Sequence, residues 1–386
     1  MSRPLSTGRI ALRIGVSALG FRVVSAVLAL YANIVFPLNQ PEPFTVFGTT
    51  SPFWDTFARY DTGYFEGIAW SGYSPAPGGR SNIAYFPVYP MLMRYVGRMF
   101  GRHHAILYLS GIAVSWVSFV LAMVALFHLA RLDLPRRRAE RAVLLTAIFP
   151  FAFFFGVAYS ESTFLLFAVL AFYLFRTRRW LLAGACGAVA TATRVPGILM
   201  WPALAWIAWR SAEPTRRDRL QALAGLALAA GGFAAYCFYI YQLTGNPFEW
   251  AATLERWGYY PGGAPWKAPI RLIQTLLTHP YRYLTTERMA PYDSLYGATG
   301  VLFVIAVPLV WRRFGAGYGL FMLLNLLLPL SSGVFEGMGR YCSVLFPCFI
   351  WLASIRSRLL STATIVLFAM FYTLGLALFT TIHPLF

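Results

Sequence analysis

The sequence has 386 residues, of which 58% are hydrophobic and 12% charged, against roughly 25% charged in an ordinary soluble domain. Several apolar runs of about 20 residues carry no charge, long enough at ~1.5 Å per residue to cross a ~30 Å hydrocarbon layer. These runs are continuous rather than alternating, which excludes a membrane β-barrel. The sequence therefore predicts an all-α, polytopic membrane protein.

The formal net charge of +18 comes mainly from arginines in short loops between the apolar runs. In a soluble protein this charge would suggest nucleic acid, but here the positive-inside rule explains it better, and no nucleic-acid motif is present. We therefore expect a membrane partner and no nucleic acid. Arginines ahead of the first apolar run, without a small-residue cleavage site, predict an anchoring helix rather than a cleaved signal peptide.

Placing every arginine cluster inside requires one pair of spans between successive clusters. The predicted spans are 14–36, 105–130, 142–158, 161–175, 180–193, 196–209, 220–243, 294–311, 316–331, 341–355 and 359–381. They make about eleven transmembrane helices in a single domain, 1–386, of a multi-pass plasma-membrane protein with its N-terminus inside. The four spans between 142 and 209 run to about 14–17 residues, at or below the usual minimum, so we expect some to be broken, re-entrant or packed behind longer helices.

Two large segments, 37–104 and 244–293, fall outside in this topology. In the first, Asp61, Tyr64, Phe65, Ile68 and Gly72 follow a helical spacing, which predicts a short amphipathic helix at the membrane surface with Asp61 in its first turn. A second amphipathic segment follows near Phe86 and Tyr89.

The topology, drawn from arginines alone, also sorts other polar residues to the outer side. These are Asp61, Ser160 and Glu161, Arg194, and Arg340 with Tyr341. Each has a structural alternative: a helix cap or partner of Arg59 for Asp61, a cap for Ser160 and Glu161, a partner of carbonyls freed near Pro196 for Arg194, and snorkelling for Arg340. Their convergence favours an anionic phosphate ligand bound by two arginines. The scattered histidines and the four cysteines have no metal-ligand spacing.

Several short motifs carry a family resemblance over roughly residues 55–355. They are Arg59-Tyr60-Asp61 with Tyr64-Phe65, Phe86-Pro87-Val88-Tyr89-Pro90, Tyr159-Ser160-Glu161-Ser162, Thr193-Arg194 with Pro196-Gly197, Leu243-Thr244-Gly245-Asn246-Pro247 with Trp257-Gly258, and Arg340-Tyr341 with Phe346-Pro347. In this order the chain resembles the PIG-V type of GT-C glycosyltransferase, the family of GPI mannosyltransferase II and its bacterial relatives.

The resemblance implies a GT-C-like fold, an essential acid in the first outer segment and a polyprenyl-phosphate sugar, usually mannose, as donor. The acid corresponds to Asp61, with Asp55 as a rival. The sequence departs from the family where Tyr60 stands in place of a frequent Trp and Tyr64 in place of a frequent His.

The expected reaction is an inverting transfer in which Asp61 takes the proton of an acceptor hydroxyl, on a lipid or a glycan. Two arginines, Arg194 and Arg340, are expected to stabilise the leaving phosphate. The candidate substrate-binding residues are Arg59, Tyr64, Phe86, Tyr89, Ser160, Glu161, Arg194, Arg340 and Tyr341. No cofactor is demanded by the sequence, although carboxylates and a phosphate are compatible with a divalent cation. Two alternatives stay open: a lipid-linked sugar flippase without chemistry, and a scaffold subunit of an envelope-assembly complex.

Overall fold

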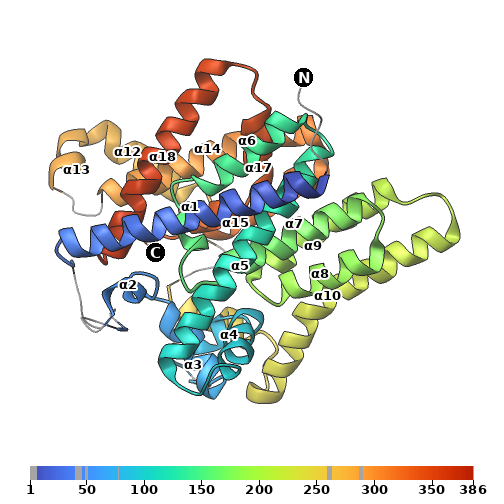
Figure 1. Ribbon diagram of the computed structural model, residues 1–386, viewed down its shortest axis with the longest axis horizontal. Helices are drawn as coiled ribbons and strands as arrows, with labels where there is room; N and C mark the ends of the chain where they lie inside the picture. The colour runs from blue at the N-terminus through green and yellow to red at the C-terminus, as the bar shows by residue number, and fades with distance from the viewer. Residues whose placement is uncertain are drawn as a thin grey trace.

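The computed structural model describes residues 7–39, 46–47, 51–76, 78–258, 263–286 and 290–385. Within these residues the chain forms helices and no strand (Figure 1), so the prediction of an all-α protein is confirmed. Parts of both predicted outer segments, 40–45, 48–50, 77, 259–262 and 287–289, lie outside the described residues.

The long helices coincide with the longest apolar runs. Five described helices are long and apolar enough to cross a membrane: α1 (Thr7–Val35), α5 (His104–Arg131), α10 (Arg216–Thr244), α14 (Ala290–Phe314) and α18 (Arg358–Thr380). Four shorter helices also overlap predicted spans: α7 (Glu161–Arg176), α8 (Trp180–Thr191), α9 (Val195–Ser211) and α15 (Ala316–Leu330).

Two predicted spans are not continuous helices. A break was expected among the four short spans that include 142–158, whereas the continuous span predicted over 341–355 is wrong. In place of 142–158 the chain forms α6 (Arg136–Ala147) and a short 3-10 helix, η3 (Ala152–Phe155). In place of 341–355 it forms α16 (Met338–Ser343) and α17 (Phe346–Ser354). Pro150 and Pro347 lie at these breaks, and proline both lacks the N–H needed by a helix and clashes with the preceding turn.

The irregular segment 148–160 is buried throughout, and neighbouring side chains bond its carbonyl groups. The Trp116 indole donates to the carbonyl of Gly156 (2.9 Å), and the Ser162 hydroxyl donates to that of Phe155 (2.8 Å). Non-helical backbone at membrane depth is tolerated only when it is satisfied inside the protein in this way. The break is therefore built into the fold, and it sets where α7 begins.

The outer segments form short helices beside the long ones. The first contains α2 (Pro52–Asp55), α3 (Thr62–Ser71), η2 (Asn82–Ala84) and α4 (Val88–Arg98), and the second α11 (Glu249–Arg256), α12 (Lys267–Thr278) and α13 (Pro280–Thr286). Helix α3 corresponds to the helix predicted at Asp61, although Asp61 precedes its first residue, Thr62. Phe65 and Ile68 are buried, and α3 packs against α4 and α5. It lies with α4 at the lower end of the molecule in Figure 1.

Helices α8 and α10 pack side by side through small residues (Figure 1). A Cβ atom added at Gly184 would overlap the backbone of Gly225, and one added at Gly232 would overlap the carbonyl oxygen of Ala188. Such close backbone approach is the usual way membrane helices associate. It fixes the end of α8, from which the chain turns into the site described below.

We expect Gly232→Ala to destabilise the protein and Gly231→Ala not to. The new methyl group of Gly232→Ala has no space against α8, whereas nothing lies within 4 Å of the corresponding position at Gly231. Overpacking of this kind costs roughly 1–3 kcal/mol, while Gly→Ala in an open helix position is neutral or stabilising by up to about 1 kcal/mol. Thermal unfolding of the purified variants in detergent measures the difference; equal midpoints would contradict this packing.

Candidate active site

Asp61 directly precedes α3, at a strained point of the backbone. Tyr60 has a φ of +49°, a left-handed conformation that costs about 1–3 kcal/mol in a bulky residue and persists only where the surroundings impose it. The Tyr60 hydroxyl donates to the carbonyl of His383 (2.7 Å), which helps to hold this turn. Asp61 makes no side-chain cap on α3, so its carboxylate is available for other contacts.

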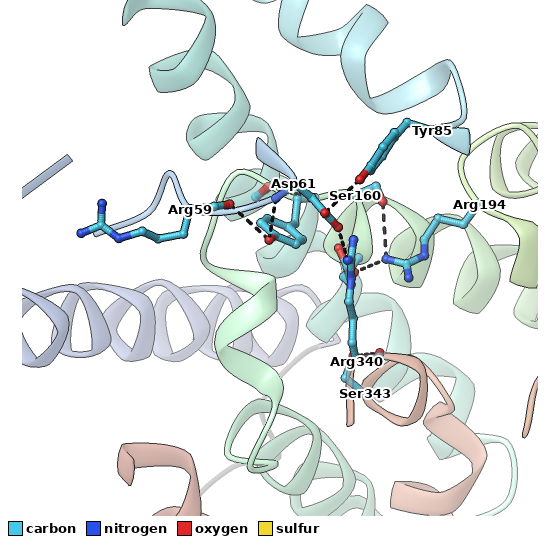
Figure 2. A network of polar contacts seen from close by, with 10 residues as sticks. Arg59, Asp61, Tyr85, Ser160, Arg194, Arg340 and Ser343 are labelled. Carbon is cyan, nitrogen blue, oxygen red and sulfur yellow. Dashed lines mark hydrogen bonds and ion pairs between the residues drawn. The ribbon is translucent and has the colours of Figure 1, made fainter. Parts of the chain in front are cut away.

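Those contacts are with two groups from distant parts of the chain (Figure 2). The Tyr85 hydroxyl donates to Asp61 Oδ1 (2.9 Å), and Arg340 Nη1 forms an ion pair with Asp61 Oδ2. Burial and the adjacent Asp61 carboxylate raise the pKa of Tyr85. The phenol is therefore protonated at neutral pH and acts as a donor to Asp61.

Glu161 is the first residue of α7 and is fully buried. Its Oε1 accepts from both Arg194 Nη1 and Arg340 Nε, so one carboxylate oxygen joins two guanidinium groups. Its Oε2 has no hydrogen-bond partner among the described residues. A buried carboxylate requires cationic partners, and Glu161 has two.

Arg194 stands in the turn between α8 and α9. Its backbone is extended (φ −160°), as is typical of the residue that precedes a helix, and Pro196 occupies the first turn of α9. The guanidinium lies 5.8 Å from the ring of Tyr341 and its Nη1 lies 3.5 Å from Ser160 Oγ. The turn thus points a cation at the start of α7.

Arg340 reaches the same place from α16. Helix α16 lies tightly against the irregular segment, because a Cβ atom at Gly339 would overlap the ring of Phe151. The guanidinium sits 4.5 Å from the ring of Tyr159 and bridges Asp61 and Glu161. None of the described residues accepts a hydrogen bond from its Nη2. A donor on Arg340 therefore remains for a ligand.

These groups surround a cavity of about 130 Å³. Its lining includes Asp61, Tyr85, Phe86, Ser160, Arg194, Trp257, Gly337, Arg340 and Tyr341. Glu161 lies behind the arginines, outside the lining. Two cations, two carboxylates and an aromatic wall can hold a polar anion and handle a proton. Across the described residues, no three His, Cys, Asp or Glu side chains gather as a metal site.

The sequence itself matches a described family. Residues 24–208 match the family described as "Mannosyltransferase (PIG-V)". The match covers just under half of the chain. No curated protein matches the sequence significantly.

The chain is also similar to solved structures. ArnT from Cupriavidus metallidurans, bound to undecaprenyl phosphate, is 13% identical with a TM-score of 0.52, covering 99% of this chain and 77% of ArnT. The apo oligosaccharyltransferase of Archaeoglobus fulgidus is 16% identical with a TM-score of 0.48, and the match covers 95% of this chain and 56% of that one. The chain thus spans little more than half of the archaeal enzyme, and the likeness to ArnT shows that the fold is GT-C-like.

Most of the predicted site residues meet in the structure. Asp61, Phe86, Ser160, Arg194, Arg340 and Tyr341 line the cavity, and Glu161 contacts both arginines. Tyr64 lies beside the lining, stacked on Tyr85 with ring centroids 5.0 Å apart.

Arg59 and Tyr89, in contrast, do not reach the cavity. The Arg59 guanidinium is buried on the far side of its own backbone (Figure 2), where it pairs with Asp55 and approaches the carbonyl of Thr380 (3.3 Å). Tyr89 is fully buried and its hydroxyl bonds Gly111 and Ser115 of α5. Both predictions of ligand contact are corrected: these side chains connect helices.

Asp55 is likewise removed from the cavity. Its Oδ1 accepts from the backbone N–H groups of Val46 (2.8 Å) and Phe47 (2.9 Å), and its Oδ2 pairs with Arg59. The i,i+4 spacing of Asp55 and Arg59 was a signal in the sequence for this pair. Tyr85 and Trp257 are among the lining residues that were not predicted. Trp257 stands within a family motif, and Tyr85 directly precedes another.

We expect Asp55→Ala to unfold the protein more readily, whereas Asp61→Asn leaves stability nearly unchanged. The Arg59 side chain is 0% exposed, and removing Asp55 leaves its charge without this carboxylate partner. Breaking a buried pair costs about 3–5 kcal/mol. The Asp61 side chain is 25% exposed, and Arg340 keeps Glu161 as a partner. Thermal unfolding measures both effects. Asp55→Ala with an unchanged midpoint but abolished function would instead make Asp55 the reactive acid.

Proposed function

We propose that this chain is an integral-membrane glycosyltransferase that moves a sugar from a polyprenyl-phosphate donor to an acceptor hydroxyl with inversion. The observation that carries the proposal is the meeting of Asp61 with two Glu161-held arginines around one cavity. The family description supports a mannosyl donor, and the shared fold with ArnT, a protein whose structure contains undecaprenyl phosphate, supports a lipid phosphate.

The cavity is proposed to face the extracytoplasmic side. Helix α7 has 16 residues, begins at Glu161 and ends at Arg176, which gives it a length of ~24 Å. Arg194 precedes α9 in the same way, and Arg210 lies in its last turn. The predicted inner arginine clusters thus lie at the opposite helix ends from the cavity. Since such clusters stay in the cytoplasm, the cavity opens outward.

In the proposed reaction an acceptor hydroxyl oxygen attacks the anomeric carbon of the sugar as the bond from that carbon to the phosphate oxygen breaks. Asp61 receives the hydroxyl proton, and the polyprenyl phosphate leaves with the electron pair. Tyr85 and Arg340 each hold one oxygen of the carboxylate, which fixes its orientation. The leaving phosphate is a weak base and needs no separate acid.

The arginines are proposed to stabilise the charge that develops on the phosphate. Each guanidinium carries five N–H donors. Glu161 contacts one nitrogen of each arginine, and Asp61 contacts a second nitrogen of Arg340. The side chains of Arg194 and Arg340 are 10% and 14% exposed, and partly dry donors act more strongly than donors in water. Glu161 serves to orient both arginines, and Phe86 and Tyr341 line the path of the sugar or lipid.

Asp61→Asn should reduce sugar transfer by roughly 10²–10⁴-fold, because the amide cannot accept the proton. The assay follows a labelled polyprenyl-phosphate sugar into product with the purified protein. Glu66→Gln is the matched control: Glu66 lies in α3, the helix that Asp61 precedes, and bonds His104 rather than lining the cavity. Transfer retained by Asp61→Asn would remove Asp61 as the base; a parent protein that binds donor but never transfers would favour a flippase.

Arg340→Lys and Arg194→Lys should each lower the rate of transfer by roughly 10–1,000-fold, with a smaller change in donor affinity. Lysine keeps the charge but cannot reproduce the fork that bridges Glu161 and the ligand. Arg178→Gln provides the control, because Arg178 pairs with Glu213 at the opposite end of the helices. Rates of Arg340→Lys and Arg194→Lys equal to the parent would show that the phosphate binds elsewhere.

A further inference from the structure

Tyr85 and Trp257 form an aromatic wall of the cavity, and Tyr64 packs against both rings from outside the lining. Tyr64 and Tyr85 stack almost in parallel (9°), and the edge of Trp257 meets Tyr64 at 4.9 Å and Tyr85 at 6.4 Å between centroids. Tyr85 is also the donor to Asp61. The wall is therefore continuous with the carboxylate assigned to the proton transfer.

Trp257 comes from the second outer segment, immediately after α11, and the first outer segment holds it in place. The hydroxyls of Ser81 and Thr253 are 3.3 Å apart and buried, and Arg80 Nε donates to the carbonyl of Arg256 (3.4 Å). The Arg80 guanidinium also lies 5.2 Å from the Trp257 ring. These contacts fix the indole against the cavity rather than leaving it on a free loop.

The indole Nε1–H of Trp257 is buried, and no described residue accepts its hydrogen bond. A buried donor without an acceptor is unfavourable, so a ligand that supplies an oxygen at this point gains affinity. A polyprenyl chain has no hydrogen-bond acceptor, and its phosphate is assigned to Arg194 and Arg340. The sugar is the part of the donor that offers both hydroxyl oxygens and an apolar C–H face for an aromatic ring.

We infer that Trp257 is a substrate-contacting residue that determines specificity for the sugar of the donor: its ring packs against the pyranose and its Nε1–H donates to a sugar hydroxyl. This inference rests on the proposed glycosyl transfer, since it takes the ligand to be a sugar lipid. It assigns the second outer segment to recognition of the sugar, and the arginines to recognition of the phosphate.

The test compares two ligands on the full-length protein in detergent: a polyprenyl-phosphate mannose and the same polyprenyl phosphate without sugar. Trp257→Phe keeps an aromatic ring and removes the N–H. It should weaken binding of the mannose lipid roughly fivefold to tenfold and change binding of the bare lipid phosphate by less than about twofold. Trp266→Phe is the control, because Trp266 lies in the same outer segment but is 63% exposed.

Equal weakening for both lipids, no weakening for either, or a parent protein that binds neither lipid would overturn the inference. Trp257→Leu and the thermal midpoints of all variants separate a lost contact from a lost fold: Trp257→Leu should discriminate further against the mannose lipid at a similar midpoint. The transfer assay is scored separately. A parent protein that binds the mannose lipid through Trp257 but transfers no sugar would refute the proposed reaction and leave the sugar contact standing.

Discussion

The contact of one Glu161 oxygen with two guanidinium groups ties together the parts of the chain that form the cavity. It joins the start of α7, the turn before α9 and helix α16. Arg194 and Arg340 lie 33 and 179 residues after Glu161 in the sequence. A carboxylate with no exposed side chain is unfavourable without cations, and two neighbouring guanidinium groups repel each other without an anion. Each group therefore requires the others, and the three segments are held at one place.

The irregular segment 148–160 makes this arrangement possible. A continuous helix over 142–158 would keep the chain in one direction. The break at Pro150 instead allows the chain to change direction inside the protein before α7 begins. Arg22 of α1 supports the break from the other side. Its buried guanidinium donates to the carbonyl of Ala152 (3.3 Å) and lies 4.1 Å from the ring of Phe119. An arginine that interrupts the first apolar run thus has a structural partner.

Much of the framework follows from the sequence. The length of the apolar runs predicts the long helices. The recurring arginine clusters predict that Asp61, Glu161, Arg194 and Arg340 lie on one side of the membrane. Both signals depend on local composition. The breaks at Pro150 and Pro347 were harder to predict, since apolar length alone does not separate a short span from two short helices.

Side-chain partners were least predictable. Periodicity shows which face of a helix is apolar, but not which distant group lies opposite. Arg59 belongs to the same motif as Asp61 and yet points away from it, since it pairs with Asp55, four residues earlier in the sequence. Tyr85 and Trp257 contact the site only because two outer segments, far apart in sequence, pack together around Ser81 and Thr253.

The charges of the four central side chains suit the proposed reaction in a partly dry cavity. Arg194, Arg340, Glu161 and Asp61 together are formally neutral. A polyprenyl-phosphate sugar brings one negative charge, and the released phosphate monoester approaches two near neutral pH. The proton that Asp61 takes up removes one negative charge from the four side chains as the phosphate gains one. Protonation also weakens the ion pair of Asp61 with Arg340, while Glu161 keeps Arg340 in place. The same proton transfer would then both activate the acceptor and direct a guanidinium to the leaving group.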